Sequence, residues 1–181
     1  MKIIDTVFSE VKLIEPRVFG DERGFFLESW NQEAFADAGL QIEFVQDNHS
    51  QSSKGVLRGL HYQITKPQGK LIRVVSGRAW DVVVDLRKSS PWFGKWAGFE
   101  LTADNKHLLW IPPGFAHGFL ALEDQTDLIY KCTNYYAPEF ERSILWSDPA
   151  IGIEWPLERQ IPRLSDKDAN GKLLIDAEIY S

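Results

Sequence analysis

The stretch Trp110-Ile111-Pro112-Pro113-Gly114-Phe115-Ala116-His117-Gly118-Phe119 places a rigid turn between two short apolar segments. Proline fixes φ and lacks an N–H donor, whereas glycine tolerates positive φ, so Pro112-Pro113-Gly114 predicts a tight turn. We expect this turn to hold the imidazole of His117 in a fixed direction. Short apolar segments cut by turn residues continue on both sides of it, which is typical of β structure.

Loop residues such as Ser52-Ser53-Lys54-Gly55 and Lys66-Pro67-Gln68-Gly69 separate the apolar segments. Two such segments, Val11–Ile14 and Gly24–Ser29, come first in the chain. The predicted strands after them are Glu43–Asp47, Val56–Gln63, Lys70–Ser76, Ala79–Leu86, Trp96–Leu101, His107–Ile111, Gly118–Leu122 and Leu128–Asn134. Regularly spaced short strands favour an all-β sandwich or barrel over β-α-β units.

Only a few short helices are expected. Asn31 can cap a helix whose alanines and phenylalanine recur at helical spacing, and Gly39 can end it. A second short helix is expected near Asp166–Asn170. From Pro138 the chain is irregular and rich in tryptophan and proline, which indicates a tail that wraps around the sheets. Because no linker-like stretch interrupts the sequence, residues 1–181 are expected to form a single domain.

Composition excludes several classes of protein. Lys and Arg number 20 against 26 Asp and Glu, and this net charge of −6 argues against a nucleic-acid partner. Cys132 is the only cysteine, so there is no disulfide framework. No apolar run approaches the ~18 residues of a membrane span, and Met1–Asp5 does not begin a signal peptide. We therefore expect a cytoplasmic protein without a membrane partner.

Two of the four histidines, His61 and His117, have unusual neighbours. Arg58 places a permanent cation three residues before His61. In a regular strand, however, side chains alternate between faces, so Arg58 and His61 would point to opposite sides. They can share a pocket only if Gly59 interrupts the alternation as a β-bulge, a possibility that the sequence leaves open.

The spacing Pro-x-Gly-x-x-His, here Pro112 to His117, resembles the second signature of cupin barrels. The first cupin signature normally provides a His-x-His pair and a glutamate, but the corresponding segment here is His61-Tyr62-Gln63. Two histidines without a third ligand of clear spacing make a poor transition-metal site. We therefore expect no metal and no cofactor, which leaves the histidines free for acid–base chemistry.

Five segments together resemble the dTDP-4-dehydrorhamnose 3,5-epimerase family, whose members have a cupin-type jelly-roll fold. These segments extend over nearly the whole chain, and in combination they are far more specific than the proline-glycine-histidine turn alone. They are Phe19–Phe26 (FGDERGFF), Phe44–Ser50 (FVQDNHS), Leu57–Gln63 (LRGLHYQ), Trp110–Phe119 (WIPPGFAHGF) and Tyr130–Tyr136 (YKCTNYY).

The resemblance implies inversion of C3 and C5 of dTDP-4-dehydro-6-deoxy-α-D-glucose, which gives dTDP-4-dehydro-β-L-rhamnose. The C4 carbonyl acidifies the protons on both carbons. The reaction therefore needs a base, an acid on the opposite face and a group that stabilises the enolate oxygen. By resemblance, His61 is the base, Asp168 is its carboxylate partner and Tyr130 is the acid. Lys70 matches the cation beside the carbonyl.

The resemblance also implies a nucleotide site. Arginine binds diphosphates through charge-assisted hydrogen bonds, and aromatic rings stack on thymine. The implied substrate-binding residues are Arg23, Phe26, Glu28, Gln46, Asp47, Asn48, Arg58, His117, Tyr135, Tyr136, Glu141 and Lys167. Members of the family form homodimers that exchange N-terminal strands, so Arg23 and Glu28 are expected to complete the site of the partner subunit.

Three other functions stay open on the sequence. A 3-epimerase, 5-epimerase or 3,4-ketoisomerase on a related dTDP sugar would share the nucleotide pocket, although Tyr130 favours an epimerase over a ketoisomerase. A metal-dependent cupin dioxygenase or isomerase would need the ligands that His61-Tyr62-Gln63 lacks. A non-catalytic sugar-binding cupin would not require both His61 and Tyr130.

Overall fold

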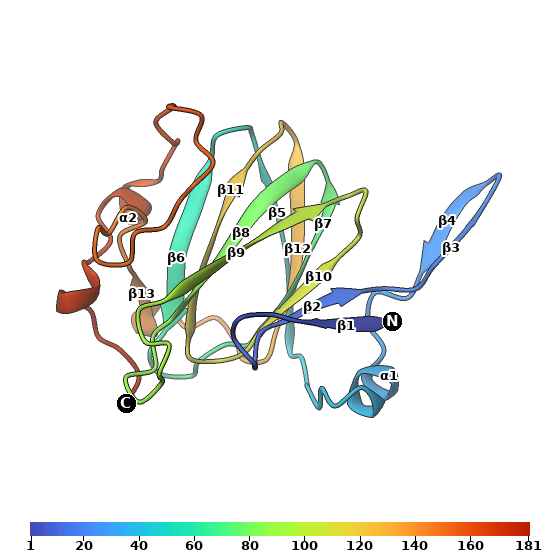
Figure 1. Ribbon diagram of the computed structural model, residues 1–181, viewed down its shortest axis with the longest axis horizontal. Coiled ribbons are helices and arrows are strands. Elements are labelled where there is room, and N and C mark those ends of the chain that lie inside the picture. The colour runs from blue at the N-terminus through green and yellow to red at the C-terminus, as the bar shows by residue number, and fades with distance from the viewer.

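Two antiparallel β-sheets face each other in the computed structural model, which describes residues 1–181 (Figure 1). The six-stranded sheet has the order β1 (Lys2–Asp5), β2 (Lys12–Glu15), β10 (Leu108–Ile111), β7 (Lys70–Ser76), β12 (Thr126–Cys132) and β5 (Gln46–Ser52). The five-stranded sheet has the order β13 (Glu141–Ser143), β6 (Leu57–Gln63), β11 (Phe115–Ala121), β8 (Arg78–Asp85) and β9 (Trp96–Thr102). This architecture confirms the expected all-β sandwich.

Alternate side chains of both sheets fill the space between them. Ile72 and Val74 of β7 pack with Val83 of β8 and Phe119 of β11, and all four are buried. Burial of each such side chain contributes about 1.5–3 kcal/mol. Toward one end of the sandwich the inward-facing side chains become polar. On β7, for example, Lys70 lies on the same face as Ile72 and Val74, at the start of the strand. The chemistry-bearing side chains therefore lie at one end of an otherwise apolar interior.

The outer face of the six-stranded sheet is covered by α1 (Gln32–Asp37), as predicted from its capping residues. The Asn31 side chain accepts a hydrogen bond from the Ala34 N–H and so caps the helix, and Phe35 is buried against Leu71 and Trp110. None of the helices has the length and apolar character that crossing a membrane requires.

The outer face of the five-stranded sheet is covered by the C-terminal segment, which is orange and red in Figure 1. Ile151 and Tyr180 of this segment pack against the outward row of β6 and β8. It also contains α2 at the predicted position and two short 3₁₀ helices: the elements are η1 (Pro138–Phe140), α2 (Asp166–Ala169) and η2 (Leu174–Asp176). The segment thereby brings α2 beside β6.

Some strand predictions were wrong. The predicted strand Glu43–Asp47 is displaced: β5 runs over Gln46–Ser52 and pairs residue by residue with β12. Apolar patterning missed it because one face of this edge strand is exposed and the other lines a polar interior. The strand predicted from Gly118 begins at Phe115, so His117 lies within β11 rather than in the turn before it. Strands β1, β3 and β13 were not predicted.

A β-bulge at Gly59 resolves the alternation problem in β6. His61 pairs with His117 and Arg58 pairs with Phe119, so three residue steps on β6 match two on β11. Arg58 and His61 therefore face the same side. Gly59 is required here because its φ is +130° and a Cβ would lie 2.4 Å from the Gly118 Cα.

The hairpin of β3 (Val18–Asp21) and β4 (Gly24–Leu27) projects away from the two sheets (Figure 1, blue). Its phenylalanine side chains are largely exposed to solvent, and Phe26 is 68% exposed. Phe19 and Phe25 are exposed as well. An exposed cluster of large apolar residues on a projecting element is typical of a surface that contacts another protein.

Candidate active site

A cavity opens at the polar end of the interior, between the two sheets. His61 and His117 enter it from the five-stranded sheet, and Lys70 enters it from the six-stranded sheet. The residues that line it are His61, Tyr62, Gln63, Gln68, Lys70, Ile111, Phe115, His117, Tyr136, Glu141 and Tyr180. Both sheets and the C-terminal segment thus contribute to one polar site.

His61 is held by a carboxylate from the C-terminal segment. Its Nε2 lies 2.6 Å from Oδ1 of Asp168, which is almost fully buried. Ser165 Oγ and the Gly59 N–H also donate to this carboxylate, at 2.6 Å and 3.2 Å. Burial acts to raise the pKa of Asp168, but the hydrogen bonds from His61 and Ser165 outweigh it and lower the pKa to about 2. With Nε2–H donated to the carboxylate, Nδ1 of His61 is the basic nitrogen.

His117 forms a second histidine–carboxylate pair next to the first. Its Nε2 lies 3.0 Å and 2.9 Å from the two carboxylate oxygens of Asp81, which is fully buried on β8. Burial lowers the pKa of His117, although the Asp81 carboxylate acts in the opposite direction. The strand register places His117 directly opposite His61, so the two imidazoles line the same wall.

Lys70 lines the opposite wall from β7. Tyr130 lies on the neighbouring strand β12, packed against the apolar interior, and is not itself among the residues that line the cavity. The Lys70 Nζ is 6.0 Å from the centroid of the Tyr130 ring. Burial lowers the pKa of Lys70, because the charged ammonium loses hydration. Burial also raises the pKa of the Tyr130 phenol, which favours its protonated form.

The two walls can act on opposite faces of a molecule that lies between them. His61, with its carboxylate partner, can accept a proton on one side, and the phenol of Tyr130 can donate one on the other. The Lys70 ammonium can stabilise negative charge that develops on an oxygen between them, and the effect is strongest where water is excluded.

Glu141 connects two other site residues at the mouth of the cavity. Its carboxylate accepts hydrogen bonds from Lys167 Nζ and from the Tyr136 hydroxyl, both at 2.9 Å. Burial acts to raise the pKa of Glu141, but these two hydrogen bonds lower it overall. Tyr135 and Tyr136 expose their rings to solvent beside this ion pair.

The polar strand β5 divides its predicted site residues between its two faces. Gln46 and Asn48 are half-buried and hydrogen-bonded to each other at 3.1 Å. Asp47 lies on the other face, where its carboxylate pairs with Lys131 at 2.9 Å. The structure therefore does not bring the Asp47 side chain to this cavity. The guanidinium of Arg58 reaches across to β5 and donates to Ser52 Oγ at 3.0 Å.

In addition to Asp47, three predicted residues near the N-terminus lie away from the cavity in this chain. Arg23 and Phe26 belong to the projecting hairpin, where the Arg23 guanidinium pairs only with Asp21. Glu28 follows the hairpin directly and does not line the cavity. A single chain thus leaves these three predicted contacts outside the site that contains His61.

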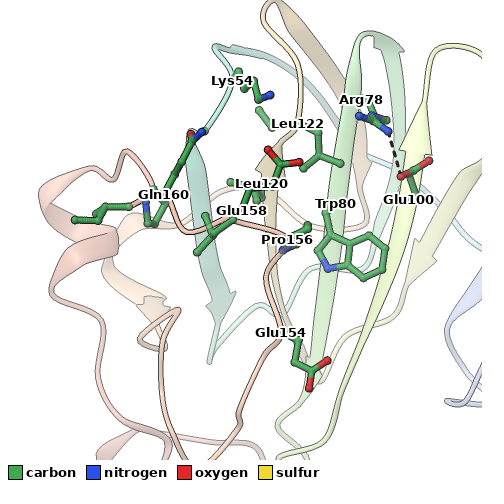
Figure 2. Close-up of a pocket in the computed structure, with 15 residues that line it drawn as sticks. Lys54, Arg78, Trp80, Glu100, Leu120, Leu122, Glu154, Pro156, Glu158 and Gln160 are labelled. Carbon is green, nitrogen blue, oxygen red and sulfur yellow. Dashed lines mark ion pairs between the residues drawn. The ribbon is translucent and has the colours of Figure 1, made fainter.

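A second hollow, drawn in Figure 2, lies on the outer side of the five-stranded sheet under the loop at 154–162. Trp80 forms its floor, and Arg78 and Glu100 form an ion pair of 3.7 Å at its rim. None of the predicted site residues lines it, and its lining contains no histidine, tyrosine or cysteine. The interior cavity is therefore the candidate active site.

Comparison with known proteins agrees with this geometry. The sequence profile of the dTDP-4-dehydrorhamnose 3,5-epimerase family matches residues 5–176. A dTDP-4-dehydrorhamnose 3,5-epimerase of Shigella flexneri is 57% identical over 182 residues, which is 99% of this chain and 99% of the relative. The chain belongs to the dTDP-4-dehydrorhamnose 3,5-epimerase family.

Solved structures of the family superpose on almost the whole chain. The dTDP-6-deoxy-D-glucose-3,5-epimerase of Legionella pneumophila, in complex with dTDP-4-keto-L-rhamnose, is 52% identical with a TM-score of 0.94 and covers 98% of this chain and 94% of its own. A 3'-monoepimerase of Streptomyces bikiniensis, in complex with dTDP-quinovose, is 36% identical with a TM-score of 0.88 and covers 94% and 87%. The expected cupin-type fold is thereby confirmed.

Sequence reasoning did not assign six residues that line the cavity: Gln63, Gln68 and Tyr180, and also Tyr62, Ile111 and Phe115. Glutamine carries no recognisable signal, because an amide in a strand or a loop is usually a solvated surface residue. Tyr180 donates a hydrogen bond of 2.6 Å to the Gln63 carbonyl and so attaches the C-terminus to the floor of the site. Only the folded C-terminal segment brings it there.

The His61–Asp168 pair makes stability depend on pH. The pKa of Asp168 is about 2 in the folded chain against 3.8 ordinarily, so its stabilising effect is present above pH 4 and disappears as the pH falls from 4 to 2. We predict that Asp168→Asn lowers the free energy of unfolding at pH 6, and that the difference from wild type shrinks toward pH 2. Urea unfolding at each pH measures it. Asp166→Asn, on the exposed side of the same helix, is the control, and a difference that does not shrink in acid contradicts the prediction.

Proposed function

We propose that this epimerase inverts C3 and C5 of dTDP-4-dehydro-6-deoxy-α-D-glucose to give dTDP-4-dehydro-β-L-rhamnose, with the residues of the interior cavity as its catalytic groups. The observation that carries the proposal is that the His61–Asp168 pair belongs to the side of the five-stranded sheet, while Lys70 and Tyr130 lie near each other on the facing six-stranded sheet. Two proton transfers on opposite faces of one sugar require this arrangement.

His61 acts as the base through Nδ1. It removes the proton from the carbon next to the C4 carbonyl, and the electron pair moves onto the carbonyl oxygen to form an enolate. Asp168 stabilises the imidazolium that results, because its carboxylate stays ionised at neutral pH. A positioned general base of this kind contributes about 10²–10⁴-fold in rate.

Tyr130 returns a proton to the opposite face of the same carbon, which inverts its configuration. Burial raises the pKa of its phenol and so keeps the donor protonated until the carbanionic centre forms. Lys70 stabilises the enolate oxygen, and loss of one such donor typically costs about 10²–10³-fold in rate. His117, held by Asp81, lies beside His61 and contacts the sugar.

The nucleotide occupies the mouth of the cavity. Tyr135 or Tyr136 stacks on the thymine, since both rings are exposed beside the Lys167–Glu141 pair. Arg58 provides a cation for the diphosphate on the same side of β6 as His61. The Legionella relative in complex with dTDP-4-keto-L-rhamnose supports a dTDP-sugar as the ligand of this site. Cys132, the single free cysteine, agrees with a reducing cytoplasm as the location.

The reaction predicts solvent exchange at two carbons. When the enzyme acts on the keto sugar in deuterated water, we expect deuterium at both C3 and C5, because each carbon loses its proton and receives one from a solvent-exchanged acid. Mass spectrometry and NMR of the product measure the label. His61→Ala is expected to remove it from both carbons. Label at C3 alone would instead assign the activity of the 3'-monoepimerase relative from Streptomyces bikiniensis.

We further propose that the active unit is a homodimer in which each projecting hairpin completes the site of the partner subunit. Arg23, Phe26 and Glu28 lie outside the cavity of their own chain, and the hairpin exposes its phenylalanines. A second copy at the mouth of the cavity would bury this apolar surface and add a cation and an aromatic ring to the nucleotide site.

Subunit mixing tests the shared site. Arg23→Ala and His61→Ala each disable every site in a pure dimer, but a mixed dimer has one site with both changes and one with neither. Refolding the two variants together is therefore expected to restore about a quarter of wild-type activity, since half of the dimers are mixed and half of their sites are intact. A mixture no more active than the average of its parents would show that each chain forms its site alone.

A further inference from the structure

Glutamine side chains form hydrogen bonds with the backbone of four consecutive residues in the loop at 134–137, which we call the tyrosine loop. Gln68 Nε2 donates to the Asn134 carbonyl at 2.8 Å, and Gln63 Nε2 donates to the Tyr135 carbonyl at 3.3 Å. The next two groups donate to glutamines: the Tyr136 N–H to Gln46 Oε1 and the Ala137 N–H to Gln63 Oε1, each at 2.9 Å. The loop has no regular secondary structure, so these amides replace the hydrogen bonds that a strand would provide.

Gln63 is the central member of this set. It is only 3% exposed, and it binds both sides of the bend, since Nε2 also donates to the Lys66 carbonyl at 2.7 Å. All of its amide groups are therefore used, and neither the sugar nor the nucleotide is needed to satisfy them. It lies two residues after His61 on β6 and directly opposite Glu141 on β13. Gln63 thus connects the strand of the proposed base to the tyrosine loop.

The tyrosine rings themselves have little packing to fix them. Tyr135 is 64% exposed and Tyr136 is 52% exposed, and the Tyr136 hydroxyl bonds only to Glu141. Tyrosine rings that stack on a nucleobase bind it best when they are already in position. Otherwise the binding of the nucleotide has to order the rings, at an entropic cost. Here the backbone is fixed from beneath instead, by amides on three separate segments of the chain.

We propose that Gln63 is a positioning residue for the nucleotide base, which it orients by holding the tyrosine loop in its binding conformation. The inference rests on the proposed function, because it assumes that thymine stacks on Tyr135 or Tyr136. Gln63 does not contact the reacting carbons. Its loss should weaken recognition of the base and leave the diphosphate contacts and proton transfer largely intact.

The test compares two ligands that share the phosphates and differ in the base: dTDP and inorganic pyrophosphate. Gln63→Met keeps the shape of the side chain and removes all three hydrogen bonds, which leaves buried backbone groups unpaired. Calorimetry on the full-length chain is expected to show a Kd for dTDP raised about tenfold and a Kd for pyrophosphate within about twofold of wild type. KM for the dTDP-sugar should rise with the Kd for dTDP, and kcat should change little.

Two further variants keep the result decisive. Gln51→Met, on the exposed face of β5, should change neither affinity. Gln68→Met removes one hydrogen bond to the loop and should weaken dTDP binding by a smaller factor than Gln63→Met does. It therefore replaces Gln63→Met in the test if that variant does not fold. Equal weakening of both ligands, or no change in dTDP affinity, would overturn the inference. If wild type itself did not bind dTDP, the proposed function would fail first, and the inference with it.

Discussion

The close approach of Gly59 to Gly118 determines which side chains face the interior of this protein. A Cβ on Gly59 would lie 2.4 Å from the Gly118 Cα, so β6 and β11 can pair closely here only because both residues are glycine. The bulge at this point reverses the alternation of β6 and turns Arg58 and His61 to the same side. The Gly59 N–H also donates to Asp168, which ties the bulge to the carboxylate that holds His61.

The proposed chemistry depends on this orientation of His61 toward the interior. Because the sandwich interior is apolar except at one end, the enolate of the proposed reaction forms in surroundings where the Lys70 ammonium is poorly screened. In the proposed mechanism the two sheets supply opposite functions: a carboxylate-supported histidine on one and a protonated phenol on the other. Stabilisation of the oxyanion and donation of a proton each contribute about 10²-fold or more, so neither group alone accounts for catalysis.

The sequence was sufficient where local patterning governs the structure. Strand alternation places Lys70 on the same side as Ile72, and the capping pattern at Asn31 predicts α1. The sequence was insufficient where pairing between distant strands determines the structure. The strand β5 has no apolar pattern, and the bulge at Gly59 depends on contact with Gly118. The functional assignment came from motifs rather than periodicity, and the role inferred for Gln63 is visible only after the loop has folded around it.

The central claim is that acid and base act from opposite walls of one cavity, and Tyr130→Phe tests it most directly. The change removes one hydroxyl and keeps the ring. His61 can still remove and return a proton on its own face, so we predict that exchange of deuterium from solvent persists while net inversion, measured by coupling to a rhamnose-forming reductase and NADPH, falls by about 10²–10⁴-fold. Near-wild-type rates in both assays would contradict the account and remove Tyr130 from the mechanism.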